Sequence, residues 1–499
     1  MSAIAIPSAL RVPLFYMTFD NSMAVSGTPV MMHKILVLGQ YKAPAPNVLA
    51  SPYQQIPITA DEQAYDYFGD SMLTDTIIAT RKADSFTELV AMGIDGLNAG
   101  SGAKADAYTF TGSAQNAGVL YLMIHGRSVQ VGIDQGDDSA TMTSKAVAAI
   151  NDLNSTAGSE LRVTATVKSG NDNIVELTAK EKGKLGNDID IRVNYYVGES
   201  LPKGVKVECG VMAGGEGTPD MTAIIAALGD EWINHIICPW NDQQSLNTLR
   251  DELIERWGPL KMMEAIAYTA FRGTHAETST WGETRNDFLV TCMGTNKMPT
   301  PPWQVAASYA GVAAYNLAID PARPLQTLIL PGVLPPSKED RWDMTERNLH
   351  LFDGVATYFV DAGGNVCIER EISTYQVNSF GSPDPSYLDI TTPATLGYYR
   401  YAMKAHIQQN YPNHKLGGDD ILAELEPGQP IVTPSIMHDV FLAKYIEMVE
   451  KGIMEDYEGF KSTLHVYRNK DDANRLEVYC NPNVINGLRI LATHAAFKL

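Results

Sequence analysis

Two stretches of alternating strand-like and helix-like segments, separated by a block of short strands, constrain the fold of this chain most. In the first stretch, apolar runs at residues 35–39 and 89–94 predict two strands. Between them, Thr59-Ala60-Asp61-Glu62 has the spacing of a capping box and predicts a helix that continues towards Arg81, with a break near Gly69. Strand, helix and strand in this order indicate an α/β layer with a parallel sheet.

The intervening block, from about residue 103 to residue 212, has a different pattern. A helix is predicted only at residues 144–153, and turn residues such as Ser169-Gly170-Asn171-Asp172 bracket the strands. We interpret the block as a β-rich domain inserted into the α/β layer. Its predicted strands are residues 107–111, 119–125, 127–133, 161–167, 174–179 and 189–196.

The α/β alternation resumes after Gly214-Gly215-Glu216-Gly217, with a helix starting at Pro219. Strands are predicted at residues 233–238, 265–271 and 288–292, and helices at 246–257 and 303–317. The C-terminal part combines helices at 396–409 and 436–451 with alternating runs at 463–468, 475–480 and 488–499. The predicted organisation is an N-terminal arm (1–30), a first core segment (31–102), the inserted domain (103–212), a second core segment (213–395) and a C-terminal α+β domain with terminal arm strands (396–499).

Charge and cysteine usage limit the partners and the compartment. Thirty-eight basic and 58 acidic side chains give a formal net charge of −20, which disfavours binding to nucleic acid or to an anionic membrane surface. The five cysteines are dispersed and form no C-x-x-C pair, as expected for reduced, mostly buried thiols in a cytosol. No signal peptide is evident, and the apolar helix at 305–319 is expected to be buried instead of crossing a membrane.

No motif in the chain indicates catalysis, a cofactor or a metal. The glycine run at 214–217 lacks the Lys-Ser/Thr pair of a phosphate-binding loop and the Gly-x-Gly-x-x-Gly spacing, so it is interpreted as a flexible linker that re-enters the core. The acidic clusters at 134–138 and 187–190 lack the spacing of a calcium loop and are expected to be solvated turns. His-Glu-x-x-His and Gly-x-Ser-x-Gly do not occur, and His275 is placed in a turn.

Both ends of the chain consist of strand-like segments that cannot satisfy their own backbone groups. Pro13 limits the N-terminal segment to an edge strand or an extended arm. Such strands could complete the sheet of their own subunit or be added to the sheet of a neighbouring subunit, and the residues alone leave both possibilities open. The candidate arm residues are Leu10, Val12, Leu14 and Tyr16 at one end and Leu476, Val478, Leu488, Ile490, Leu491, Phe497 and Leu499 at the other.

Several segments in fixed order carry a resemblance to a known family. They are Ile6-Pro7-Ser8-Ala9-Leu10-Arg11-Val12-Pro13, Asp320-Pro321-Ala322-Arg323-Pro324, Asp353-Gly354-Val355-Ala356-Thr357, Pro427-Gly428-Gln429-Pro430 and Tyr467-Arg468-Asn469. With them the chain resembles the tail sheath proteins of contractile-tailed phages, in particular the Mu-like group. It departs from the family pattern at Phe68-Gly69-Asp70-Ser71, where a second glycine is usual, and at Ile372-Ser373-Thr374-Tyr375, where the family has Ile-Thr-Thr-Tyr.

The resemblance implies a mechanical subunit and not an enzyme. It implies a subtilisin-like α/β core without a marked triad, and polymerisation into stacked rings, sixfold in the family, that form a helical sheath. The expected partners are further copies of the chain, an inner tail tube protein, and baseplate and tail terminator proteins. The sheath would assemble in the host cytoplasm, belong to the virion, and contract to drive the tube through the host envelope. The resemblance also favours strand addition between neighbouring subunits over strands that complete their own sheet.

Three other functions stay open from the sequence. One is a hydrolase on a doubly wound sheet, and another is the sheath of a phage-derived bacteriocin or other contractile injection system. The third is a binding module, which would require an exposed aromatic patch in the inserted domain. Periodicity instead predicts packed aromatics at the candidate positions Tyr108, Phe110, Tyr121, Tyr195 and Tyr196.

Overall fold

The computed structural model describes residues 30–41, 48–95, 97, 100–155, 161–421 and 428–498. The chain divides into two compact units. The core unit comprises Met32–Gly397 together with Val484–Leu499, and the C-terminal unit comprises Met1–Met31 together with Tyr398–Asn483. The structure thus assigns the last residues of the chain to the core unit. The predicted five-part organisation at finer boundaries stays a prediction.

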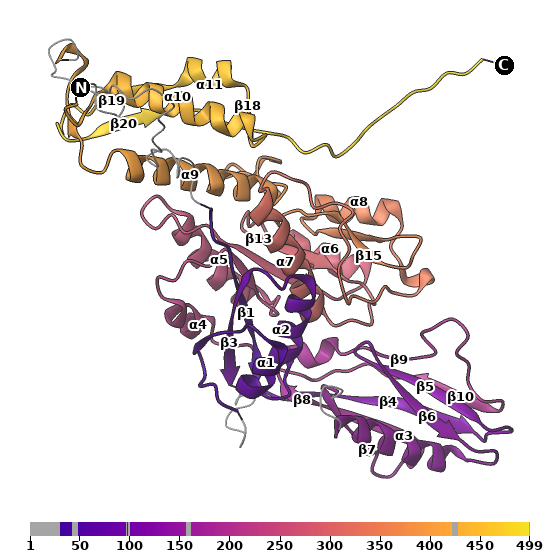
Figure 1. The fold of residues 1–499 in the computed structure, drawn as a ribbon. Helices are drawn as coiled ribbons and strands as arrows, with labels where there is room; N and C mark the ends of the chain where they lie inside the picture. Colours follow the sequence, from indigo (N-terminus) through magenta and orange to yellow (C-terminus); the bar gives the residue numbers. More distant parts are fainter. Residues whose placement is uncertain are drawn as a thin grey trace, which may run out of the picture. The chain divides into compact units, whose positions relative to one another are not determined.

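A six-stranded sheet forms the centre of the core unit, with the order β13-β12-β11-β1-β3-β2. Figure 1 labels its paired strands β1 and β3. Five strands are parallel, as the alternation of strands and helices predicted, and only β2 at the edge is antiparallel. Their bounds are β1 (Lys34–Tyr41), β2 (Gln55–Pro57), β3 (Glu88–Asp95), β11 (His235–Ile237), β12 (Ile266–Phe271) and β13 (Val290–Gly294).

The two faces of this sheet are buried in two separate hydrophobic clusters. Ile35 and Val37 of β1 belong to a cluster with α2 (Met72–Ala83) and α7 (Pro302–Ile319). Their neighbours Leu36 and Leu38 belong to the other cluster, which includes α5 (Gln243–Trp257). Alternate side chains of a strand point to opposite faces, so a continuous apolar run is required where both faces are covered.

Helix starts in the first core segment differ from the prediction in detail. The helix α1 (Asp61–Phe68) has Ala60, and not Thr59, at its N-cap, so the expected capping box is wrong. Ala60 has no side-chain oxygen, and the Gln63 side chain instead accepts hydrogen bonds from the backbone N–H groups of Thr59 and Ala60 at 2.8 and 3.3 Å. The predicted break near Gly69 is present, because Ser71 accepts from the Thr74 N–H and starts α2 there.

The described part of the inserted domain contains two antiparallel sheets, the α-helix α3 and the short 3₁₀ helix η1. The sheets have the orders β10-β4-β8-β7 and β6-β5-β9, and α3 packs against β4, β6 and β7. The helix begins five residues before its predicted start, because Asp138 caps it by accepting from the Thr141 N–H. The bounds are β4 (Gly102–Gly112), β5 (Gly118–Ile124), β6 (Arg127–Ile133), α3 (Ser139–Asn154), β7 (Val163–Val167), β8 (Ile174–Lys182), η1 (Lys184–Asp188), β9 (Ile191–Val193) and β10 (Val205–Cys209).

The glycine run at 214–217 re-enters the core, but its expected flexibility is wrong. Ser101 and Glu216 form an antiparallel bridge with N–O distances of 3.0 and 3.2 Å. The Asn187 side chain holds Gly215 on both sides, since it donates to the Gly215 carbonyl at 2.9 Å and accepts from its N–H at 2.8 Å. The two ends of the inserted domain therefore lie side by side.

A buried ion cluster joins the inserted domain to α2. Arg162, 1% exposed, pairs with Asp70, with Asp75 at 3.1 Å and with Glu181 at 3.5 Å. Glu181 also accepts from the backbone N–H of Met72 at the start of α2, at 3.2 Å. Buried charges are tolerated when they are paired and hydrogen-bonded, so this cluster fixes the inserted domain on the core.

The second core segment contains two helices that the sequence interpretation did not identify, α6 (His275–Glu283) and α8 (Met344–Phe352). His275 was placed in a turn, but it is the first residue of α6, and its Nδ1 lies 2.9 Å from Nε2 of His350 in α8. The short edge strand β2 was not predicted either. The remaining elements of this segment are α4 (Met221–Leu228), η2 (Lys338–Asp340), β14 (Thr357–Val360) and β15 (Val366–Arg370).

The C-terminal unit is an α+β structure, as predicted. The division between the units falls within α9 (Thr391–Asn410), and the chain then forms α10, α11 and the antiparallel hairpin β19–β20. The bounds are β16 (Lys415–Leu416), η3 (Asp419–Ile421), β17 (Ile431–Val432), α10 (Pro434–Glu450), β18 (Met454–Glu455), α11 (Tyr457–Thr463), β19 (His465–Arg468), β20 (Leu476–Tyr479) and β21 (Asn483–Val484).

The cysteines and the apolar helix can be compared directly with the expectations. All five cysteines are free; Cys238, Cys292 and Cys367 are buried, Cys480 is half-buried, and Cys209 is exposed, contrary to the general expectation of burial. The helix α7 is almost wholly buried in the core unit. Among the described residues, no helix is both long and apolar enough to cross a membrane.

We expect Arg162→Met to destabilise the core unit by about 3–5 kcal/mol, because it leaves buried carboxylates without their shared partner. Arg81→Met is the matched control, since Arg81 pairs with Asp61 on the surface and its loss should cost less than about 1 kcal/mol. All six tryptophans lie between residues 232 and 342, so tryptophan fluorescence during urea unfolding reports on the core unit. Equal midpoints for both variants would contradict this role of the cluster.

Stability of the core unit should fall on mild acidification because of a buried histidine pair. His33 Nδ1 lies 2.9 Å from His235 Nε2, and His235 Nδ1 lies 3.1 Å from the Tyr268 hydroxyl. Burial lowers the pKa of His33 to about 4 and, together with His33, holds the pKa of His235 well below its usual value. The unfolded chain therefore binds more protons than the folded one below about pH 6.5.

Between about pH 6.5 and pH 4, each such histidine should remove up to about 1.4 kcal/mol per pH unit, and the contribution is absent above that window. His33→Gln should reduce the pH dependence of the fluorescence-detected unfolding free energy by up to this amount. His494→Gln, at an exposed position, serves as the control. A variant with the full pH dependence would show that His33 is not protonated on unfolding.

Candidate functional site

The candidate assembly site in the C-terminal unit is built on the hairpin β19–β20. His465 lies opposite Tyr479 and Arg468 opposite Leu476. At the turn, the Asn469 side chain accepts from the N–H groups of Asp471 and Asp472 at 2.8 and 2.9 Å. A two-stranded ladder uses one edge of each strand, so the other edges of β19 and β20 carry no ladder partner in the part of the chain that the structure describes.

Two helices hold this hairpin. The helix α10 packs against β19 and contacts α11. Tyr445 of α10 stacks on Phe460 of α11 with ring centroids 3.7 Å apart and the rings nearly parallel. The Tyr445 hydroxyl donates to the Glu455 carbonyl oxygen at 2.7 Å, so the aromatic pair is fixed at its polar end as well.

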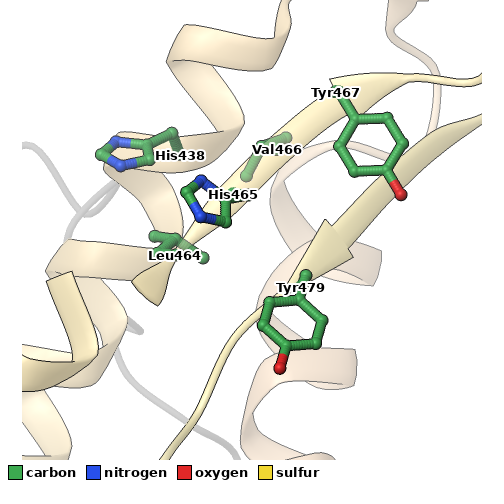
Figure 2. A pocket seen from close by; sticks show the side chains of 6 residues that line it. All are labelled: His438, Leu464, His465, Val466, Tyr467 and Tyr479. Carbon is green, nitrogen blue, oxygen red and sulfur yellow. The ribbon is translucent and has the colours of Figure 1, made fainter. Parts of the chain in front are cut away.

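An open groove of about 640 Å³ lies beside the hairpin. Figure 2 shows His438 on a helix near His465, while Tyr467 and Tyr479 project from the two neighbouring strands. Tyr467 and Tyr479 are 51% and 58% exposed, so both rings keep much of their surface available for contact. The groove is lined by side chains from both strands of the hairpin, and the free strand edges offer backbone hydrogen bonds. An added strand could therefore bond to an edge while its side chains enter the groove.

The structure places the candidate arm residues in different environments. Leu476 and Val478 lie in β20 and pair within the subunit's own hairpin, where they are half-buried. Leu10, Val12, Leu14, Tyr16 and Leu499 lie outside the described residues. In the single subunit, residues 485–498 have no strand partner and no regular structure, so the strand at 488–499 stays a prediction. In this tail, Leu488, Ile490, Leu491 and Phe497 are 70%, 82%, 77% and 85% exposed.

The acidic clusters serve local structure. Asp134 and Asp137 both bind Lys145, which agrees with turn carboxylates at the surface. The expected solvation of Asp190 is wrong, because Asp190 is buried and paired with Arg192 and Arg272. Among the residues that the structure describes, no group of three or more His, Cys, Asp or Glu side chains is placed to hold a metal.

The aromatic residues of the inserted domain form no common exposed patch. Tyr108 and Phe110 are fully buried, as their periodicity predicted, and Tyr121 is half-buried. The Tyr195 hydroxyl donates to the Pro335 carbonyl oxygen, while Tyr196 is 47% exposed. The arrangement does not provide the stacking surface that a carbohydrate-binding module requires.

Comparison with known proteins gives the family. The phage tail sheath protein central domain matches residues 214–374, and the phage tail sheath C-terminal domain matches residues 382–498. The chain is 43% identical over 496 residues to the Mu-like prophage FluMu tail sheath protein of Haemophilus influenzae, and the match covers 99% of both chains. These matches define a structural subunit of a contractile tail. The chain belongs to the phage tail sheath proteins, and the resemblance noted in its sequence is confirmed.

Solved structures of sheath proteins are similar over nearly the whole chain at low identity. The sheath tail protein of Desulfitobacterium hafniense is 12% identical, with a TM-score of 0.46 and coverage of 94% of this chain and 100% of that one. The helical sheath of the anti-feeding prophage in its contracted state is 10% identical, with a TM-score of 0.46 and coverage of 98% and 99%.

We expect Phe460→Ala to destabilise the C-terminal unit by about 3–5 kcal/mol, because it empties a buried position and removes the stacking partner of Tyr445. Tyr467→Ala, at an exposed position, should change stability by less than about 1 kcal/mol. The unit has no tryptophan, so hydrogen exchange of peptides from α10 and α11 is the suitable measurement. Unchanged exchange in Phe460→Ala would show that the stack does not support the hairpin.

Proposed function

We propose that this tail sheath protein polymerises as stacked rings, sixfold as in its family, around an inner tube, and that subunits are joined by exchanged terminal strands. The observation that supports the proposal is that one chain contains both an exposed apolar tail and a hairpin with free strand edges. The tail at 488–498 exposes large apolar side chains without a partner in the described part of the chain, and the hairpin β19–β20 has free edges beside an open groove. The tail could supply a strand with apolar side chains, and the hairpin could supply the strand edge and the groove that such a strand requires.

Strand addition of this kind suits a polymer that changes shape. Backbone hydrogen bonds between an added strand and a sheet edge are independent of how the attached globular bodies are oriented, so they can persist while those bodies move. The donated tail and the accepting hairpin are different surfaces, so the contact is heterologous and can continue from subunit to subunit without closing. Candidate donors at the N-terminus are Leu10, Val12, Leu14 and Tyr16, with Leu499 continuing the C-terminal arm.

The core supports a mechanical interpretation. A parallel sheet covered on both faces is consistent with the subtilisin-like core expected for the family, but a fold by itself confers no catalysis. Contraction needs no nucleotide in this proposal, since the energy is the free-energy difference between two sets of contacts between subunits. The sheath would assemble in the host cytoplasm on a baseplate, end at a terminator protein, and drive the tube through the host envelope.

The proposal is tested by electron microscopy of purified protein with and without its tube protein. The full chain should form tubes or stacked rings, and a variant that ends at Arg489, or one that lacks residues 1–20, should remain as single subunits. Replacement of Ile490, Leu491 and Phe497 by serine should also prevent assembly, because it removes the apolar side chains that would fill the groove. Thr493→Ala with His494→Ala is the matched control and should assemble. Normal tubes from the truncated chain would exclude C-terminal strand exchange.

A further inference from the structure

The C-terminal tail makes specific contacts with the core unit before it becomes free. Gly487 lies against Pro324 so closely that a Cβ atom on Gly487 would be 2.7 Å from the proline Cγ. The Gln326 side chain donates from Nε2 to the carbonyl oxygen of Leu488 at 3.1 Å. These two contacts position the backbone of the tail one residue before Arg489.

Arg489 then binds two carboxylates of the core unit. Its Nη2 lies 2.5 Å from Oε1 of Glu371 and 3.2 Å from Oδ1 of Asp389, and its Nη1 lies 3.3 Å from Oε1 of Gln326. The Arg489 side chain is 13% exposed and the Glu371 side chain 0% exposed. The Arg489 guanidinium is therefore the cation that pairs with the fully buried Glu371 carboxylate. We name this contact of Arg489 with Glu371, Asp389 and Gln326 the tail clasp.

The tail clasp is balanced in charge, and its two carboxylates accept further hydrogen bonds from the core unit. Arg370 binds Asp389 through two hydrogen bonds of 2.9 and 3.1 Å, and the backbone N–H of Leu325 donates to Glu371 at 3.1 Å. Two arginines thus face two carboxylates in a mostly buried site. If Arg489 leaves, Glu371 keeps a buried negative charge without its cation, which is strongly unfavourable. This cost favours the state in which Arg489 stays bound to Glu371, even when other parts of the tail move.

Beyond Arg489 the side chains of the tail make no such contacts in the part of the chain that the structure describes. Ile490, Leu491 and Phe497 are 82%, 77% and 85% exposed, although all three are large and apolar. The tail is therefore bound to the core unit as far as Arg489, and the described residues 490–498 are exposed. The ten residues from 490 to 499 could reach about 33 Å when extended, at about 3.3 Å for each residue.

We propose that Arg489 is a positioning residue for assembly, in that the tail clasp fixes the point at which the C-terminal arm leaves its own subunit. Only residues from 490 onwards would then be available to a neighbour, and the reach and register of the exchanged strand would be set by this anchor. The role in assembly rests on the proposed strand exchange, whereas the clasp itself is a property of the single subunit. The two can therefore be tested separately.

Limited proteolysis of the unassembled full-length protein tests the clasp. Trypsin must bind the Arg489 side chain to cut after it, so a closed clasp protects this bond. Glu371→Gln keeps the shape but removes the buried charge, and loss of one charge-assisted hydrogen bond should increase cleavage after Arg489 about tenfold or more. Intact-mass measurement detects loss of residues 490–499. Glu369→Gln is the matched control, because Glu369 lies two residues before Glu371, in strand β15, but pairs with Arg347.

Hydrogen exchange of the peptide 484–489 provides a second measurement that also applies to Arg489→Gln, which has no tryptic site there. Faster exchange is expected in Glu371→Gln and Arg489→Gln and not in Glu369→Gln, and a cooperative fluorescence-detected unfolding transition in each variant is the proof of folding. Equal protection of the tail in Glu371→Gln and Glu369→Gln would overturn the clasp.

The role in assembly is then measured by electron microscopy of the same variants. Glu371→Gln and Arg489→Gln should give fewer tubes, or tubes with irregular spacing, while Glu369→Gln assembles as the unmodified chain does. Regular tubes from variants with a released tail would overturn the positioning role. If the unmodified chain forms no tubes with its tube protein, the proposed function fails, and the proteolysis result still decides whether the clasp exists.

Discussion

The burial of both faces of the central parallel sheet is the constraint on which the rest of the structure depends. A parallel sheet has to be covered on each side, and here the two coverings have different origins. On one face α2 and α7 pack closely, and at Gly311 a Cβ atom would come within 2.8 Å of Ala83. On the other face the hydrophobic cluster continues from β1 and α5 into the inserted domain, including Leu120 and Leu177. The inserted domain therefore shares a continuous hydrophobic cluster with this face of the sheet.

Much of the core could be predicted because its apolar runs are long and uniform. The strands β1 and β12 and the first three turns of the helix α7 are almost wholly buried, and their sequences allow few other interpretations. The helices α6 and α8 were missed because they are short and largely polar, so periodicity gives little signal. A usable signal was nevertheless present, since Thr274 with Glu277 and Asp343 with Glu346 each form a capping box at the start of these helices.

The candidate site shows where sequence patterns reach their limit. Alternation of apolar residues at 488–499 indicates what the segment can do beside a sheet edge, and in the single subunit the described part of that segment has no such edge. The hairpin β19–β20 was identified because both of its strands and the turn between them are local in sequence. The contact of Arg489 with Glu371 spans 118 residues, and no local pattern reports a contact of that range. For Asp190 the sequence shows the neighbouring Arg192, but its second partner, Arg272, lies 82 residues away.

The bridge between Ser101 and Glu216 has a consequence for the evolution of this protein. A domain whose first and last residues are adjacent can change in size, or be exchanged for another domain, without displacing the strands that precede and follow it. The surface of a sheath could be diversified at this position while its internal sheet stays the same. The cost of such an exchange is local and identifiable, because Asp70 and Asp75 on the core side would lose Arg162. A replacement domain has to supply a cation at this position, or Asp70 and Asp75 have to be replaced by neutral residues.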